Sequence, residues 1–251
     1  MLFFTEIILL LVEQTNLHYQ QQWDRQAGPS RRLPDITLPD IMTFTALALQ
    51  MGHIVKDTLH DYWSRLKLMH NPFYGEPMTR DRFLHILRFL HFVDNSGRPD
   101  PGEEYDRLWK IRTIFDTLNQ AYPKFYNPLE HLSVDEVIVK FHGRVIFRQY
   151  IPKKRKRFGI KIYKLCDELG YTYMKVYLGR DSRSATDDMT ATHATVRYLT
   201  CRVEGLGHKL FMDNFFSSPR LFDDLLRRKI HSCGTVWPNR KDTPSDFGPK
   251  K

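Results

Sequence analysis

The sequence predicts an α+β protein in which a helical N-terminal region precedes a mixed β-sheet with flanking helices. Two observations predict this order. Apolar residues recur at helical spacing through the first half of the chain, whereas β-branched residues gather in short runs after Pro128. Several consecutive strand patterns are then followed by a β-α-β pattern, which favours an α+β or mixed sheet.

The clearest helix is expected from Thr79 to Val93. Thr79 suits an N-cap, and Asp81 lies in the first turn, where the helix dipole favours a negative charge. One apolar stripe follows at helical spacing: Phe83, Ile86, Leu87 and Leu90. Other helices of this half are expected over residues 2–22, 37–51, 58–69 and 108–122.

The pattern changes to short strands after Pro128. Strands are expected over residues 132–141, 144–151, 158–166, 171–178, 210–212 and 230–237, with helices over 190–202 and 219–228. We therefore expect three parts: a helical region of residues 1–128, a sheet domain of residues 129–240, and a polar tail of residues 241–251.

The composition limits the class of protein. Apolar residues make up 41% of the 251 residues, so the chain can bury a core and is not expected to be disordered. Its three cysteines are far apart and form no C-x-x-C, which supports neither a disulfide framework nor a zinc site. The apolar N-terminus is too short to span a bilayer and lacks a basic n-region. No membrane partner is expected.

Positive charge is concentrated in one segment. The net charge is +9, and the window from Lys140 to Lys164 holds ten Lys or Arg residues with no Asp or Glu, so the rest of the chain sums to about −1. A localised basic block favours a surface that faces a polyanion such as DNA, although a solvated charged face or a nuclear import signal are alternatives. The candidate DNA-contacting residues are Lys140, Arg144, Arg148, Lys153, Lys154, Arg155, Lys156, Arg157 and Lys161.

Aromatic residues accompany the basic block. We interpret Phe147, Tyr150 and Phe158 as core or edge packing rather than as groups that stack on bases.

Two acidic residues stand out by their context. Asp135 lies within a strand-like run, where an ionised carboxylate is costly unless it is paired or binds a metal. Asp213 lies at the end of a short apolar strand, Leu210 to Met212. Carboxylates on neighbouring strands commonly hold the divalent ions that serve phosphodiester chemistry. The alternatives are a surface strand residue for Asp135 and an Asx-turn for Asp213.

The other acidic pairs are weaker candidates. Asp187 and Asp188 are adjacent in a polar stretch. Asp223 and Asp224 are expected on the solvent side of a helix whose apolar stripe faces the other way. There is neither a Gly-rich phosphate loop nor a nucleophile elbow, so we expect no small-molecule substrate.

Several ordered motifs resemble the piggyBac transposases. In the second half they are Leu132-Ser-Val-Asp-Glu136, Phe141-His-Gly-Arg144, Tyr150-Ile-Pro-Lys153, Gly159-Ile-Lys161, the run from Leu210 to Ser218, and Asn239-Arg-Lys241. In the first half they are Glu13-Gln-Thr-Asn16, Asp61-Tyr-Trp-Ser64, Met78 to Phe83 and Arg88 to Asn95. The resemblance covers about residues 3–245.

The resemblance implies a ribonuclease-H-like catalytic domain with three aspartates that use divalent metal, Mg²⁺ or Mn²⁺, to cut and paste DNA at TTAA sites. By the match, Asp135 is the first catalytic and metal-binding aspartate and Asp213 is the second. The helical half resembles the region that dimerises and binds DNA. The partners implied are double-stranded DNA and a second copy of the chain, and the location implied is the nucleus.

The sequence departs from the family pattern near its end. The family's third aspartate lies well beyond the last expected strand, whereas this sequence ends at Lys251, and no cysteine-rich C-terminal domain is present. We therefore expect a truncated, transposon-derived DNA-binding protein with a partial ribonuclease-H-like domain. Such a chain is not competent for transposition and need not bind metal. The alternative is an active metal-dependent transposase if the true product extends beyond Lys251.

Overall fold

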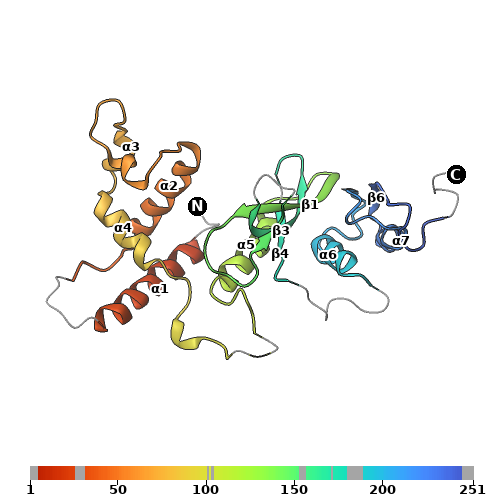
Figure 1. The fold of residues 1–251 in the computed structure, drawn as a ribbon, viewed down its shortest axis with the longest axis horizontal. Helices are drawn as coiled ribbons and strands as arrows, with labels where there is room; N and C mark the ends of the chain where they lie inside the picture. The colour runs from red at the N-terminus through yellow and green to blue at the C-terminus, as the bar shows by residue number, and fades with distance from the viewer. Residues whose placement is uncertain are drawn as a thin grey trace. The chain divides into compact units, whose positions relative to one another are not determined.

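The computed structural model describes residues 5–25, 32–100, 102, 105–152, 157–170, 172–179 and 189–244. The chain forms two compact units, Met1–Thr117 and Leu118–Lys251. The first unit contains helices and the second contains the sheet (Figure 1), which confirms the α+β class. The division into residues 1–128, 129–240 and 241–251 stays a prediction.

The helical unit is built around three helices: α1 (Thr5–Asp24), α2 (Leu38–His53) and α4 (Arg80–Phe89). Shorter elements connect or follow them: η1 (Leu59–Trp63), α3 (Pro72–Gly75) and η2 (Asn95–Gly97). The start of α5 (Arg112–Phe125) also belongs to this unit.

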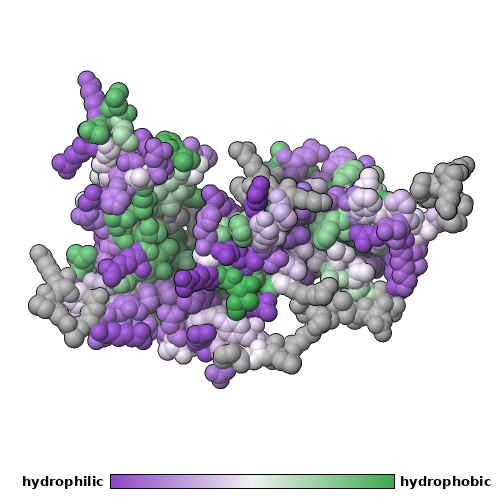
Figure 2. Space-filling model, in the orientation of Figure 1, coloured by the Kyte–Doolittle hydropathy of each residue, from purple (hydrophilic) through white to green (hydrophobic). Residues whose placement is uncertain are grey.

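Polar residues fix where α2 and α4 begin. Thr37 and Asp40 form a capping box at the start of α2, and the hydroxyl of Thr79 accepts a hydrogen bond from the backbone N–H of Arg82 at the start of α4. The guanidinium of Arg82 then joins the two helices, since Nη2 lies 2.7 Å from Oδ2 of Asp40. Hydrophobic surface is visible on this unit over α2 and α4 (Figure 2).

Two expected elements are much shorter in the structure. The helix expected over residues 58–69 is reduced to η1, because hydrogen bonds from Tyr62 Oη to the carbonyl of Ile54 (2.8 Å) and from Trp63 Nε1 to that of Met78 (2.9 Å) hold the aromatic pair against other segments. The strand expected over residues 144–151 is reduced to β2 (Gln149–Tyr150). Local propensity is a weak guide where such tertiary bonds dominate.

The second unit contains a mixed sheet. Its strands are β1 (His131–Lys140), β2, β3 (Phe158–Asp167), β4 (Thr172–Val176), β5 (Lys209–Met212) and β6 (His231–Gly234). Within the described residues they make one six-stranded sheet of order β2-β3-β1-β5-β6, in which β4 also pairs with β3. Central β1 runs antiparallel to β3 and parallel to β5, and β5 runs parallel to β6.

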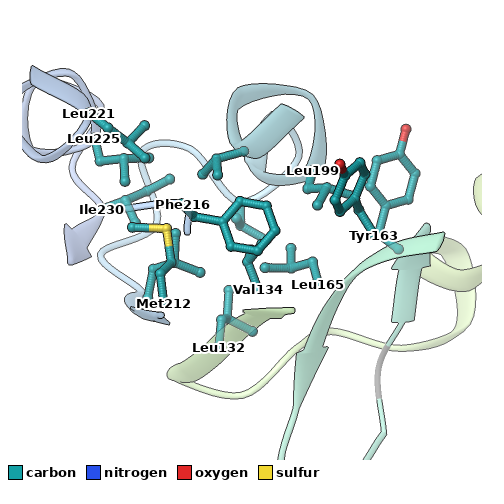
Figure 3. Close-up of a cluster of buried hydrophobic side chains, with 14 residues drawn as sticks. Leu132, Val134, Tyr163, Leu165, Leu199, Met212, Phe216, Leu221, Leu225 and Ile230 are labelled. Atoms are coloured by element: carbon teal, nitrogen blue, oxygen red, sulfur yellow. The ribbon is translucent and has the colours of Figure 1, made fainter. Parts of the chain in front are cut away.

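The core of this unit lies between the sheet and the helices α6 (Ala191–Thr200) and α7 (Pro219–Arg227). Alternate residues of β1 and β5 enter it, namely Leu132 and Val134, and Leu210 and Met212. Figure 3 shows the Phe216 ring pointing toward Val134 and Leu165. Full burial of each such side chain stabilises the fold by roughly 1.5–3 kcal/mol, so the register of β1 and β5 is strongly determined.

Candidate functional site

The two aspartates lie at the same point of two neighbouring strands. In the parallel pair of β1 and β5, Val134 is the register partner of Met212, and both are buried in the core. Asp135 directly follows Val134 on β1, and Asp213 directly follows Met212 at the end of β5. Both aspartates are exposed. Because neighbouring strands lie about 4.8 Å apart, this register brings the two residues side by side at the end of the parallel pair.

In each aspartate, one carboxylate oxygen accepts a backbone hydrogen bond and the other is available to bind an ion. Oδ1 of Asp135 accepts a hydrogen bond from the backbone N–H of Glu136 at 2.7 Å, and Oδ1 of Asp213 accepts one from the N–H of Phe215 at 3.0 Å. Among the described residues, Oδ2 of neither aspartate has a hydrogen-bond or ion-pair partner. Asp213 does form the Asx-turn that the sequence allowed, but this turn leaves one carboxylate oxygen open to an ion.

A third acidic ligand does not join the pair in the described part of the chain. No group of three or more His, Cys, Asp or Glu side chains that could hold a metal occurs there. Lys164 is the register partner of Asp135 on β3, so a positive residue lies opposite the first aspartate. The pair can supply two negative oxygen ligands, which suits Mg²⁺ or Mn²⁺ that retain water molecules.

The basic residues lie on the β2–β3 hairpin and on the segment that leads to it from the end of β1, which begins five residues after Asp135. Lys140, Arg144 and Arg157 are exposed. Arg148 is also exposed, and its Nη1 donates hydrogen bonds of 3.2 Å to the carbonyls of His142 and Gly143. The rest of the basic run, Lys153 to Lys156, lies outside the described residues.

Lys161 differs from the other basic residues. It is half-buried, and its Nζ lies 4.7 Å from the ring centre of Phe215, 4.9 Å from that of Tyr163 and 6.0 Å from that of Tyr177. A lysine among three aromatic rings is held by cation–π attraction. Its surroundings do not resemble those of an exposed phosphate-binding side chain.

The aromatic residues of the hairpin divide into two groups. Phe147 is buried, as expected for core packing. Tyr150 and Phe158 are register partners with ring centres 4.6 Å apart, as expected for packing at a sheet edge, yet they stay 57% and 45% exposed. Arg148 lies 5.6 Å from the Phe158 ring centre, so the aromatic pair and the basic surface are continuous.

A second polar cluster lies between α6 and α7, and the sequence patterns did not reveal it. Nε2 of the buried His193 lies 2.9 Å from Oδ2 of Asp224, and Arg228 joins Asp224 to Glu204. Burial alone would raise the pKa of Asp224, but the hydrogen bonds from His193 and Arg228 outweigh it and lower that pKa. The expectation that Asp224 faces solvent is therefore wrong, whereas Asp223 is exposed as expected.

The comparisons with known proteins identify the class. A family model described as Transposase IS4 matches residues 1–251. The chain therefore belongs to this transposase family, and its α+β fold with a ribonuclease-H-like sheet is the fold of that class.

Within that class the similarity is to piggyBac proteins. The chain is 29% identical to human "PiggyBac transposable element-derived protein 3" over 242 residues, which are 94% of this chain and 38% of that protein. It is 24% identical to human "PiggyBac transposable element-derived protein 2" over 250 residues, 96% of this chain and 40% of that one. The cryo-EM structure of a piggyBac transposase synaptic complex with hairpin DNA matches with a TM-score of 0.85 and 30% identity, covering all of this chain and 53% of that one. This chain is a piggyBac transposase-derived protein that spans about two fifths of the length of these human relatives.

Proposed function

We propose that this protein binds DNA with the basic surface around the β2–β3 hairpin and holds a divalent metal between Asp135 and Asp213. The observation that carries the proposal is the β1–β5 register, which makes the two aspartates neighbours. The two residues are 78 positions apart in the sequence, and each keeps an Oδ2 atom without a protein partner in the described region, which supports a role as metal ligands.

The residues present fit a hard divalent ion. Both ligands are carboxylates, the donor type that Mg²⁺ and Mn²⁺ prefer. When bound, such an ion would polarise a phosphodiester and lower the pKa of a bound water molecule. The protein's own part is to orient the two carboxylates, which the backbone N–H groups of Glu136 and Phe215 do through Oδ1.

The charge distribution supports DNA as the partner. The window from Lys140 to Lys164 contains no Asp or Glu, and its described residues include several cations on and beside β2 and β3. The exposed rings of Tyr150 and Phe158 lie among these cations. The similar piggyBac structure is a complex with hairpin DNA. Basic residues beside exposed aromatic rings suit a nucleic-acid backbone and its bases.

The salt dependence of binding tests this proposal. If about five cations meet phosphate, the slope of log affinity against log salt should be near −4 to −5. Replacing Lys153, Lys154, Arg155, Lys156 and Arg157 with Gln should flatten the slope. Replacing Lys56, Lys67 and Lys110 in the helical unit with Gln, which removes three cations elsewhere in the chain, is the control and should change the slope much less. An unchanged slope in the hairpin variant would mean that the block faces away from DNA.

We further propose that the 251-residue chain alone does not transpose. The pair of aspartates provides two of the ligands that two-metal chemistry needs, and no third acid joins them among the described residues. The second candidate is an active transposase, favoured if the polypeptide extends beyond Lys251, because the relatives are much longer than this chain. Incubating the chain with supercoiled DNA and Mg²⁺ or Mn²⁺ separates the two, since metal-dependent nicking that is lost in Asp135→Asn supports the enzyme.

A homodimer and a nuclear location are also proposed. Leu38, Met42 and Leu49 form an exposed apolar stripe along one side of α2 and stay 39%, 41% and 67% exposed, a surface suited to a second copy. Light scattering should show a dimer that Met42→Glu with Leu49→Glu converts to a monomer. The basic run supports nuclear import, which a fluorescent fusion would report.

A further inference from the structure

The loop after β5 carries Asp213 and turns back on itself. The backbone carbonyl of Asp213 accepts hydrogen bonds from the N–H (3.1 Å) and the hydroxyl (2.8 Å) of Ser217, which is fully buried. The Phe215 N–H holds the Asp213 side chain. These bonds are internal to the loop, so they shape it but do not attach it to the rest of the unit.

Arg240 attaches the loop from the segment that follows β6. Its Nη2 donates hydrogen bonds to the carbonyls of Asn214 (2.9 Å) and Phe215 (2.7 Å), the two residues directly after Asp213. Hydrogen bonds from a charged donor are about twice as strong as neutral ones. Arg240 is itself fixed by a turn, because its N–H donates to the carbonyl of Trp237 at 3.0 Å.

Lys161 attaches the same loop from the other side, on β3. Its ammonium lies 4.7 Å from the ring centre of Phe215, and Tyr163 and Tyr177 complete the aromatic surroundings. Two cations that are 79 positions apart in the sequence therefore converge on one loop.

Neither cation contacts the carboxylate of Asp213. Arg240 binds backbone carbonyls and Lys161 binds rings, and in the described region the Asp213 side chain has no ion-pair partner. A direct ion pair would compete with a metal for the carboxylate. Contacts to the backbone and the ring fix the position of the acid and leave its charge available.

We propose that Lys161 and Arg240 are positioning residues that hold the Asp213 loop next to Asp135. The catalytic meaning of this arrangement rests on the proposed metal site. Lys161 then holds the loop and does not contact DNA, although its positive charge places it among the candidate DNA-contacting residues of the sequence. Lys161→Met should leave the salt slope of DNA binding unchanged, while Arg144→Gln should reduce its magnitude by about 0.9.

Amide hydrogen exchange tests the attachment without any metal. In Arg240→Met and in Lys161→Met, the Phe215 and Ser217 amides should exchange at least about tenfold faster, while the Leu165 amide in the core strand keeps its rate. Arg240→Lys should restore part of the protection, and Lys241→Met, at an exposed neighbour, is the matched control. Unchanged loop amides, or equal acceleration of loop and core, would overturn the proposal. If Arg240→Met does not fold, Arg240→Lys and Lys161→Met still decide the outcome.

Titration with Mn²⁺ alone separates this inference from the proposed function. If the unmodified chain binds Mn²⁺, Arg240→Met should weaken the affinity about tenfold, as loss of a supporting contact does at metal sites. Equal affinity in the variant would contradict a positioning role. If the unmodified chain and Asp213→Asn both fail to bind Mn²⁺, the metal proposal fails, and the exchange rates still decide whether the cations hold the loop.

Discussion

At the scale of single residues, Asp40 is a carboxylate of the helical unit whose pKa is strongly lowered in the fold. Burial would raise its pKa, but hydrogen bonds from Arg82 and Thr37 outweigh burial and lower the pKa to about 2 from a usual value of 3.8. The carboxylate of Asp40 thus joins the cap of α2 to α4, with a side chain only 22% exposed. The ionised carboxylate therefore stabilises both the start of α2 and the contact between α2 and α4.

We expect Asp40→Asn to destabilise the helical unit in a pH-dependent way. Because the pKa is lower in the folded state than in the unfolded state, the stabilisation is complete above about pH 5 and is lost as pH falls from about 4 to 2. The free energy of unfolding should therefore differ by about 2 kcal/mol at pH 7 and by little near pH 2. Urea unfolding followed by tryptophan fluorescence measures it, since Trp23, Trp63 and Trp109 lie in this unit.

The control is Asp35→Asn, which removes an ion pair whose aspartate is 65% exposed and should cost little. A difference between Asp40→Asn and the unmodified chain that stays constant from pH 7 to pH 2 would contradict the assignment.

Asp224 offers a second test at this scale. It accepts hydrogen bonds from His193 and Arg228, so Asp224→Ala leaves a buried imidazole and a guanidinium without their partner. Loss of a charged partner of this kind costs roughly 2–3 kcal/mol. Asp223→Ala, at the adjacent exposed position, should cost less than about 0.5 kcal/mol. Similar losses in the two variants would show that Asp224 faces solvent after all.

At the scale of elements, the closeness of β1 and β3 depends on Gly159. A Cβ atom at this position would overlap the backbone carbonyl of Val139 and lie 2.8 Å from Cγ2 of Ile138. The carbonyl of Val139 is part of the β1 backbone, so the overlap with it cannot be relieved by turning a flexible side chain. Gly159 therefore lets the basic hairpin pack against the strand that carries Asp135.

We expect Gly159→Ala to lower the stability of the second unit by about 1–3 kcal/mol and to speed the exchange of the Val139 and Ile160 amides. The matched control is Gly52→Ala in α2, where nothing lies within 4 Å and alanine is the better helix former. Gly52→Ala should be neutral or slightly stabilising. A stable Gly159→Ala protein with native exchange would refute the close approach.

The elements themselves were largely predictable, while their ends were not. The apolar period of α4 and the Thr79 cap predicted that helix, but it ends at Phe89 rather than Val93. The segment over residues 58–69 kept its apolar spacing, yet hydrogen bonds to distant carbonyls prevented a longer helix. Periodicity reports which residues will be buried, whereas the ends of an element depend on contacts that the pattern does not contain.

At the scale of the whole molecule, the chain carries both a basic surface at the β2–β3 hairpin and the neighbouring carboxylates of Asp135 and Asp213. No helix in the described residues is long and apolar enough to cross a bilayer. Three cysteines are free, with Cys201 and Cys233 exposed. The family and the fold are those of piggyBac transposases, and the chain spans 38% of the human relative "PiggyBac transposable element-derived protein 3".

We expect no excision when the 251-residue chain is the only transposase in cells that carry a reporter flanked by cognate ends. In the described part of the chain no third acid joins Asp135 and Asp213, and ligands that leave an ion misplaced by about 1 Å can cost roughly a hundredfold in rate. A complete piggyBac transposase is the positive control. Clean excision that disappears in Asp135→Asn would contradict this prediction. It would mean that a third metal ligand lies within the chain.

The sequence by itself determined the α+β class, the family, the two aspartates and the basic block. Each of these depends on residue type, local period or charge along a continuous stretch of chain. The resemblance already implied that Asp135 and Asp213 share one site, and the strand register shows how the fold makes them neighbours. The tertiary structure alone decided that Asp224 lies against His193 and that Arg240 and Lys161 meet at one loop. These contacts join residues far apart in the sequence, and they exist only because the core fixes the strand register, in which a shift of one residue would turn both aspartates toward the interior.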